Sequence, residues 1–298
     1  MRIQIVLNPN AGSADEIEAI RATLQRHLPE ALIRETAHPG DAQRFAREAL
    51  AAGAEVIVAA GGDGTLNEVV NGLADDFGRA CLGLLPLGTG NDFARTINIP
   101  AELEAACAIL RANQRRAVDV VRVQSDRTRY FINVSAGGFT GLVDEKLTDE
   151  IKKSWGPLAY LRSAAEALPE MVAYEATISF DDQPPQRMRV YSVVVANARY
   201  AGGGIPVAPQ AEIDDGLLDV LIVPAASLPA LVIVAAQILL GQHTDSDQVI
   251  MRRARRVAVA SQPGMWFNAD GELVGNQPAT FEVVPRALQV IVGPPPDD

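Results

Sequence analysis

Two aspartates, Asp63 and Asp92, each stand inside a loop of glycine and other small residues. The first loop reads GGDGT over Gly61–Thr65, and the second reads LGTGND over Leu87–Asp92. Glycine leaves backbone N–H groups open to an anion, and a helix that follows adds partial positive charge at its N-terminus. A bare carboxylate in such a loop would repel phosphate. The pattern therefore predicts a magnesium ion that bridges carboxylate and phosphate oxygens, directly or through water.

A third loop of this kind, NPNAGS over Asn8–Ser13, follows the first predicted strand. One glycine loop alone is more often a plain turn, but three loops after three strands suggest a polyphosphate site. The Rossmann fingerprint is absent, because Asn67 and Phe93 stand where its last glycine would be. The P-loop is absent as well, since no glycine in the chain is followed by lysine.

The loop aspartates also have structural alternatives. Asn91 or Asp92 could cap the short helix predicted after them, and a cap does not exclude metal binding. Asp63 has no comparable alternative, because Thr65 is better placed to cap the next helix. Asp119 begins the first strand of the second predicted domain, where it could join the other two acids at the domain junction.

Strands and helices alternate through the first third of the chain. The predicted strands are Ile3–Leu7, Ala31–Glu35, Val56–Ala60 and Cys81–Leu85. The predicted helices are Ala14–Leu28, Asp41–Ala52, Leu66–Leu73 and Glu102–Ala112, with a short helix after Asp92. This alternation predicts a three-layer α/β domain with a parallel sheet, in which ligands bind at the carboxyl ends of the strands.

From about Val118 the pattern changes to strand-like runs separated by turn signals. One helical stretch, about Lys152–Leu168, interrupts these runs, and the tail GPPPDD is expected to be disordered. The second part is therefore predicted to be a mostly antiparallel β-sandwich. The predicted domains are residues 1–122 and residues 123–298.

Composition excludes several classes of partner. The net charge of −11 argues against nucleic acid, which needs a basic face, and against a purely electrostatic attraction to anionic membranes.

Cys81 and Cys107 lie among apolar neighbours and are expected to be buried, reduced thiols. The N-terminus lacks the pattern of a signal peptide, so the cytoplasm is the expected location.

One uncharged segment, Val220–Thr244, tests whether the chain crosses a membrane. Pro224 and Pro229 interrupt it, and it lacks the run of about 20 apolar residues that a spanning helix needs. We expect instead a strand over Leu217–Val223 and a well-buried helix over about Leu228–Leu240.

Longer motifs resemble a known family. GGDGTLNEVVNGL, followed at short distance by PLGTGNDFAR, resembles the catalytic domain of the diacylglycerol kinase family, in particular bacterial lipid kinases of the diacylglycerol/sphingosine kinase group. NPNAG, ANARYAGGGIPVAPQAEIDDGLLDV and NADGE are also similar to that family, so the resemblance covers essentially the whole chain. It implies an α/β ATP-binding domain over residues 1–122 and a β-sandwich lipid-substrate domain over residues 123–298. In some members the C-terminal end packs back on the first domain.

The resemblance implies ATP-dependent phosphorylation of a lipid hydroxyl, of diacylglycerol or a related lipid, by a cytoplasmic enzyme of phospholipid metabolism that visits the membrane surface. ATP would lie in the cleft between the domains. The expected nucleotide contacts are the three glycine loops and one threonine: Asn8, Pro9, Asn10, Ala11, Gly12, Thr36, Gly61, Gly62, Asp63, Gly64, Thr65, Leu66, Asn67, Glu68, Gly88, Thr89, Gly90 and Asn91. Phosphoryl transfer requires mainly positioning and charge balance from the protein.

The resemblance also implies roles for acidic residues in holding magnesium. A carboxylate–water network around the catalytic ion would consist of Asp63, Asp92 and Asp119. Asp215, with the backbone carbonyls of Glu212 and Leu217, would hold a second, structural ion. Taken without the resemblance, the IDDGLL sequence around Asp215 predicts only a turn.

The proton of the lipid hydroxyl would be accepted by Glu272, with Asp270 as the other candidate. The two acids flank Gly271, and without the resemblance this Asp-Gly pair is more typical of a solvated hairpin turn. The basic run RRARR over Arg252–Arg256 is expected to be a solvated strand edge, with contact to anionic lipid headgroups as the alternative.

Two other functions remain open at this point. One is a different kinase with a GGDGT loop, such as an NAD kinase or a phosphofructokinase-like enzyme. The other is a nucleotide-binding regulator without turnover, which the intact acids Asp63, Asp92, Asp270 and Glu272 disfavour.

Overall fold

The structure is a computed structural model that describes residues 2–11, 14–138 and 172–295 of the 298-residue chain. Gly12, the helix predicted over about Lys152–Leu168 and the last three residues of the tail lie outside the described residues. The chain divides into two compact units. One comprises Met1–Val120 together with Pro285–Asp298, and the other comprises Val121–Val284.

The first unit is built on a parallel sheet. Its strand order is β2 (Leu32–Glu35), β1 (Ile3–Leu7), β3 (Val56–Gly61) and β4 (Cys81–Pro86), and the end of β15 (Ala279–Ile291) runs parallel to β4. Every residue of β1, β3 and β4 is buried. Such continuous apolar strands suit a sheet that is covered on both faces.

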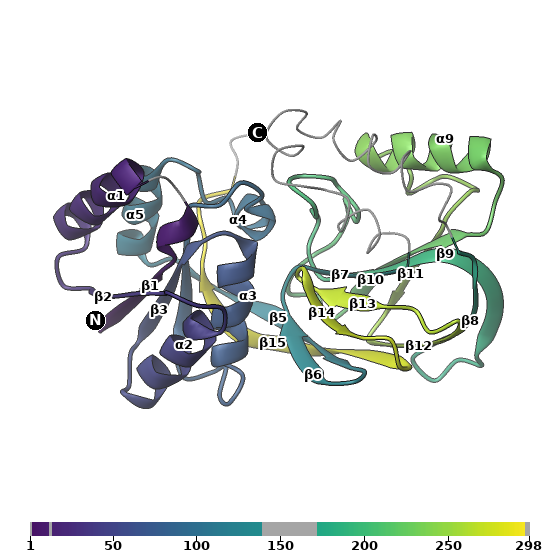
Figure 1. Ribbon diagram of the computed structural model, residues 1–298, viewed down its shortest axis with the longest axis horizontal. Helices are drawn as coiled ribbons and strands as arrows, with labels where there is room; N and C mark the ends of the chain where they lie inside the picture. The colour runs from purple at the N-terminus through teal and green to yellow at the C-terminus, as the bar shows by residue number, and fades with distance from the viewer. Residues whose placement is uncertain (1, 12–13, 139–171, 296–298) are drawn as a thin grey trace. The chain divides into compact units, whose positions relative to one another are not determined.

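Helices cover both faces of this sheet (Figure 1). On one face α1 (Ala14–His27) packs against α5 (Leu103–Ala112), and α5 packs on β4. On the other face α2 (Asp41–Ala51) packs against α3 (Asp63–Gly72), and both contact β3. A short 3-10 helix, η1 (Pro9–Ala11), follows β1, and the one-turn helix α4 (Asp92–Thr96) follows β4. The predicted three-layer α/β architecture is confirmed.

The second unit is an antiparallel β structure. Its strands are β6 (Thr128–Phe131), β7 (Val134–Gly138), β8 (Tyr174–Phe180), β9 (Gln186–Ala196), β10 (Leu218–Pro224), β11 (Ile250–Ala254), β12 (Arg256–Gln262), β13 (Phe267–Ala269) and β14 (Glu272–Gly275), with the ends of β5 (Arg115–Gln124) and β15. The long strand β9 pairs with β10 along one edge, and with β8 and then β7 along the other. In the core between strands, the ring of Phe281 packs edge-on against the rings of Phe131 and Phe267. The predicted β-sandwich is confirmed.

The helix α9 (Leu228–Leu239) lies where the sequence predicts a helix, but the expectation that it is well buried is wrong. Only Leu231 and Val234 are buried. Val234 packs with Leu221 of β10 in a second, smaller apolar cluster. The sheet covers only one side of the helix. In the described part of the chain, no helix has the length and apolar character needed to span a membrane.

Gly72 lies at the close contact between α3 and α2. A Cβ atom at this position would stand 2.5 Å from the carbonyl oxygen of Gln43 and 2.7 Å from Cβ of Ala46. In an open helix, replacement of glycine by alanine stabilises by about 1 kcal/mol. We expect Gly72→Ala instead to lower the free energy of unfolding by about 1–3 kcal/mol, measured by urea denaturation, because the two helices must separate. Gly64→Ala, in open space in the first turn of the same helix, is the control and should cause no loss. Equal responses of the two variants would contradict this packing.

Candidate active site

The three glycine loops begin at the carboxyl ends of neighbouring parallel strands, β1, β3 and β4. The sheet hydrogen bonding continues into the loops: the N–H of Asn8 donates to the carbonyl of Ala60 over 2.9 Å, and that of Leu87 donates to Gly61 over 3.0 Å. The structure thus brings the loops together at the carboxyl ends of the parallel strands, the position at which α/β proteins bind ligands.

The loops after β1 and β3 are joined by side chains. The amide of Asn8 donates to the hydroxyl of Thr65 over 3.2 Å. A Cβ at Gly61 would stand 2.4 Å from that hydroxyl oxygen, so this position must be glycine for Thr65 to pack there. The prediction that Thr65 caps the helix is wrong. Helix α3 begins at Asp63 with Gly62 at the N-cap, and Thr65 lies inside its first turn.

The loops after β3 and β4 approach each other even more closely. A Cβ at Gly88 would stand 2.4 Å from Cα of Gly62. Across this contact, the N–H of Asp92 donates to Oδ1 of Asp63 over 2.9 Å. Asp63 therefore does have a capping role, although for α4 and not for its own helix. Asn91 occupies the N-cap of α4, but its side chain accepts the N–H of Gly88 and makes no cap hydrogen bond.

The electrostatics of this contact favour a cation. Burial raises the pKa of Asp63, and the nearby carboxylate of Asp92 raises it further, while backbone N–H groups at the start of α4 act in the opposite direction. Asp92 itself is buried. Two carboxylates that disfavour each other's charge next to an expected phosphate site are suited to a divalent ion.

The described residues contain no group of three or more His, Cys, Asp or Glu side chains that could by itself hold a metal ion. An ion at Asp63 and Asp92 would take its remaining ligands from phosphate and water, which is usual for magnesium. The third expected member, Asp119, is fully buried in β5, and its Oδ1 accepts the N–H of Arg286 over 2.6 Å. Arg286 has a left-handed backbone with φ of 50°, so one function of Asp119 is to hold the chain at this irregular position within β15.

Other expected nucleotide residues have structural partners. The carboxylate of Glu68 accepts the N–H groups of Gly40 and Ala42 over 2.9 and 3.0 Å, and so caps the start of α2. Asn67 is buried, and its carbonyl accepts the side-chain amide of Asn71. Leu66 is buried against the core, whereas Gly64 and Thr89 are exposed.

Pro9, Asn10 and Ala11 form η1, where the N–H of Asn10 donates to the side chain of Asn8. Thr36 follows β2, and its N–H donates to the carbonyl of Leu7 over 2.9 Å. Gly90 lies between Thr89 and Asn91 in the loop after β4. These residues all lie at the carboxyl ends of the parallel strands, as the loops do.

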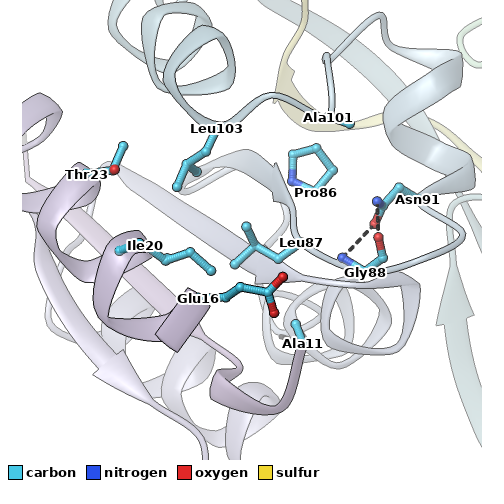
Figure 2. A pocket seen from close by; sticks show the side chains of 11 residues that line it. Ala11, Glu16, Ile20, Thr23, Pro86, Leu87, Gly88, Asn91, Ala101 and Leu103 are labelled. Atoms are coloured by element: carbon cyan, nitrogen blue, oxygen red, sulfur yellow. Dashed lines mark hydrogen bonds between the residues drawn. The ribbon is translucent and has the colours of Figure 1, made fainter. Parts of the chain in front are cut away.

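A pocket of about 430 Å³ opens beside two of the loops, on the face of the sheet covered by α1 and α5 (Figure 2). Its lining combines groups of the loops with both apolar and polar side chains from the helices: Ala11, Glu16, Ala19, Ile20, Thr23, Pro86, Leu87, Gly88, Asn91, Ala101 and Leu103. The pocket leaves Gly88 and Asn91 accessible to a ligand. The lining residues Glu16, Ile20, Thr23 and Leu103 are not predicted from the sequence, because each is ordinary for an amphipathic helix.

In the second unit, the two candidate proton acceptors have different surroundings. Asp270 and Gly271 form the two-residue turn between β13 and β14, with φ of 46° and 88°. The carboxylate of Asp270 accepts the N–H groups of Ile132, Asn133 and Val134 over 3.2, 3.2 and 2.8 Å. Glu272 begins β14 and is exposed. The hairpin turn that the Asp-Gly pair predicts is present, and Asp270 fastens it to β7.

The site expected for a structural magnesium ion contains an arginine. The guanidinium of Arg253 forms an ion pair with Asp215, and its Nε lies 3.5 Å from Oδ1 of Asp219. The N–H of Leu217 donates to the other carboxylate oxygen of Asp215, and Glu212 is exposed. Arg253 thus already balances the charge of Asp215, and this geometry does not by itself call for a second cation.

Both units match known families. The model described as the diacylglycerol kinase catalytic domain matches residues 2–123, and the model of the YegS C-terminal NAD kinase beta sandwich-like domain matches residues 133–292. The Staphylococcus saprophyticus protein named diacylglycerol kinase is 32% identical, over 97% of this chain and 94% of its own length. The chain belongs to the diacylglycerol kinase family. It is a lipid kinase by this membership, as the sequence motifs predicted.

Further relatives agree with this assignment. A Bacillus subtilis diacylglycerol kinase is 34% identical to this kinase, over 98% of this chain and 96% of its own. The Pseudomonas aeruginosa protein named "Probable lipid kinase YegS-like" is 36% identical, over 97% and 93%. The crystal structure of a diacylglycerol kinase from Bacillus anthracis has a TM-score of 0.76 over 98% of this chain and 97% of that one. Its 22% identity shows the shared fold alone.

The raised pKa of Asp63 generates a pH-dependent prediction. Above this pKa the ionised carboxylate destabilises the fold. Asp63→Asn keeps an oxygen for the N–H of Asp92 and removes the charge. We therefore expect this variant to melt a few degrees above the parent at pH 7, with the difference shrinking as the pH falls through the raised pKa and vanishing below about 4. Differential scanning calorimetry across this range measures it.

Asp41→Asn is the matched control, because removal of this charge should change the melting temperature in the opposite direction. The hydrogen bond from Arg44 and two backbone N–H groups lower the pKa of Asp41. Its ionised form therefore stabilises the fold above the ordinary pKa of aspartate, and this contribution is lost as the pH falls through the lowered pKa. Asp41→Asn should melt below the parent at pH 7. An Asp63→Asn variant that also melts lower at pH 7 would contradict the destabilising role of the Asp63 charge.

Proposed function

We propose that this kinase transfers the γ-phosphate of ATP to the hydroxyl of diacylglycerol or a related lipid at a membrane surface. The observation that carries the proposal is the contact between the glycine loops after β3 and β4, where the carboxylate of Asp63 accepts the N–H of Asp92 and lies close enough to the carboxylate of Asp92 to interact with it. Family membership supports a lipid as the acceptor, because the relatives are named as diacylglycerol or lipid kinases.

The phosphates of ATP would be held by the loops. Gly64 leaves the backbone at the start of α3 unobstructed, and the first turns of α3 and α4 add their partial positive charge. Asn8 and Thr65 fix the loop after β1 against α3, so that these groups are in place before the nucleotide arrives. Preorganised donors of this kind are the main contribution of a protein to phosphoryl transfer.

Asp63 and Asp92 would hold the magnesium ion, with Asp119 as a third member acting through water. A bound magnesium ion would neutralise negative charge on the phosphates. The protein's part is to keep both carboxylates ionised and oriented, and the N–H of Asp92 orients Asp63 directly.

Glu272 is proposed to accept the proton of the lipid hydroxyl. Its carboxylate is exposed, whereas that of Asp270 already accepts three backbone N–H groups. A carboxylate committed to three such bonds is a poor proton acceptor, since hydrogen bonds to the charged form lower its basicity. Asp270 is proposed instead to position the hairpin that carries Glu272.

A phosphorylation assay tests the proposed function. Purified protein is incubated with labelled ATP, magnesium and mixed micelles that contain diacylglycerol, monoacylglycerol, ceramide, sphingosine or phosphatidylglycerol, with NAD as a separate acceptor. Label in one of the lipids is the expected result, and omission of magnesium should abolish it. Label in NAD alone would replace the lipid kinase with an NAD kinase, and ATP binding with no transfer would indicate a regulator.

Two substitutions distinguish the role of Glu272 from that of Asp270. Glu272→Gln should reduce turnover at least about 100-fold, the usual contribution of a general base, with ATP affinity and stability unchanged. Asp270→Asn should lower the free energy of unfolding by about 1–3 kcal/mol, because one carbonyl oxygen cannot replace both carboxylate oxygens. Turnover, ATP titration and urea denaturation measure these effects. Full turnover in Glu272→Gln would remove this residue from its role.

A further inference from the structure

Helix α9 exposes large apolar side chains. The described residues contain eight exposed large hydrophobic side chains, and four of them lie on α9 or at the residue that ends it. They are Leu228, Val232, Ile233 and Leu240, with exposed fractions of 55%, 54%, 48% and 69%. Single exposed aliphatic residues are ordinary, but a group of four on one helix indicates an interaction surface.

The exposed residues share one side of the helix. At 100° per residue, Leu228, Val232, Ile233 and Leu240 fall within one arc, while Leu231, Val234 and Ile238 fall on the opposite side. On that side, Val234 and Ile238 pack against the sheet. Ala236 and Pro229 complete the outer side and are exposed. The helix is therefore apolar all round, with Gln237 as its one polar residue within Leu228–Leu239.

This composition does not suit a helix that faces water on its outer side. A surface helix of a soluble protein has a polar outer face, and an all-round apolar helix belongs in a core or in lipid. A helix that lies in a membrane interface normally needs a polar face of its own. Here the sheet of the second unit covers the side of α9 on which that polar face would stand, and the outer side stays apolar.

Basic residues lie on the sheet face near the start of the helix, whereas the exposed Asp245 and Asp247 follow its end. Met188 of β9 packs into the sandwich core, so Arg187 and Arg189 point to the opposite face, the face on which α9 packs. The carbonyl of Arg189 accepts the N–H of Ala225, just before the helix begins. Arg189 pairs with Glu175, and Arg187 is exposed and has no acidic partner among the described residues. An exposed cation on the same sheet face as the uncharged helix would meet phosphate headgroups when the helix meets hydrocarbon.

We propose that α9 lies flat in the surface of a lipid bilayer and inserts Leu228, Val232, Ile233 and Leu240 among the acyl chains. This inference rests on the proposed function, because a lipid substrate is the reason for membrane contact. With twelve residues the helix is about 18 Å long, too short to span the bilayer and long enough to lie along it.

Vesicle binding tests this surface without requiring catalysis. The full chain is mixed with vesicles of phosphatidylglycerol and phosphatidylethanolamine that contain no diacylglycerol, without ATP, and sedimented. We expect the parent to bind and the double variant Val232→Glu with Ile233→Glu to bind at least about tenfold more weakly. Leu32→Glu, at an equally exposed leucine in β2 of the first unit, is the matched control and should bind like the parent. Unchanged melting temperatures establish that the variants fold.

A fluorescent label reports the insertion itself. Cys81 and Cys107 are buried, and burial raises the pKa of each thiol to about 11, so a thiol reagent should select a newly introduced cysteine. An environment-sensitive dye on Ile233→Cys should shift to the blue when vesicles are added, and the same dye on Leu32→Cys should not. Equal responses at both positions would overturn the proposal.

The outcomes separate this inference from the proposed function. If the parent phosphorylates no lipid but α9 mediates vesicle binding, the proposed function fails and the surface assignment stands. If vesicle diacylglycerol is phosphorylated equally by the parent and the α9 double variant, with equal vesicle binding, the surface assignment fails alone. A second copy of the chain is the other partner that could bind the exposed side of α9, and analytical ultracentrifugation tests for it. If the double substitution converts a dimer to a monomer and leaves vesicle binding unchanged, α9 contacts a second copy of the chain and the proposal is overturned.

Discussion

The hydrogen bond from the N–H of Asp92 to the carboxylate of Asp63 is the interaction on which the candidate site depends. It joins residues 29 positions apart and holds the loop after β3 against the loop after β4. Glycine at positions 62 and 88 is what allows the backbones to come this close. The same contact buries one carboxylate beside another and raises the pKa of Asp63. The ionised carboxylate is therefore unfavourable in this position, and a bound cation would reduce that electrostatic repulsion.

The acidic residues of the chain show how the tertiary structure separates chemically similar groups. Glu68 caps α2, Asp270 fastens a hairpin, and Asp215 pairs with Arg253. Each of these carboxylates has its charge compensated by protein donors. Glu272, the residue proposed to accept the proton, is exposed at the start of β14.

Helix α9 shows the limit of reasoning from composition. An uncharged, apolar helix is expected to be buried, and the second unit buries only the side that carries Leu231 and Val234. Hydropathy records how apolar a segment is, but the fraction that is covered depends on how much sheet lies beneath it. The exposed side is a property of the fold and is not visible in the sequence.

The α/β and β-sandwich organisation, the three glycine loops, the Asp-Gly turn and the family can be predicted from the sequence, because they depend on local periodicity, turn chemistry and contiguous motifs. Three features become visible only in the folded chain: α3 begins at Asp63, Asp63 caps α4, and Thr65 bonds to Asn8. The lining of the pocket by Glu16 and Ile20 likewise emerges only in the fold. Local rules describe which groups need partners, whereas the choice among partners far apart in the chain is made when the elements pack.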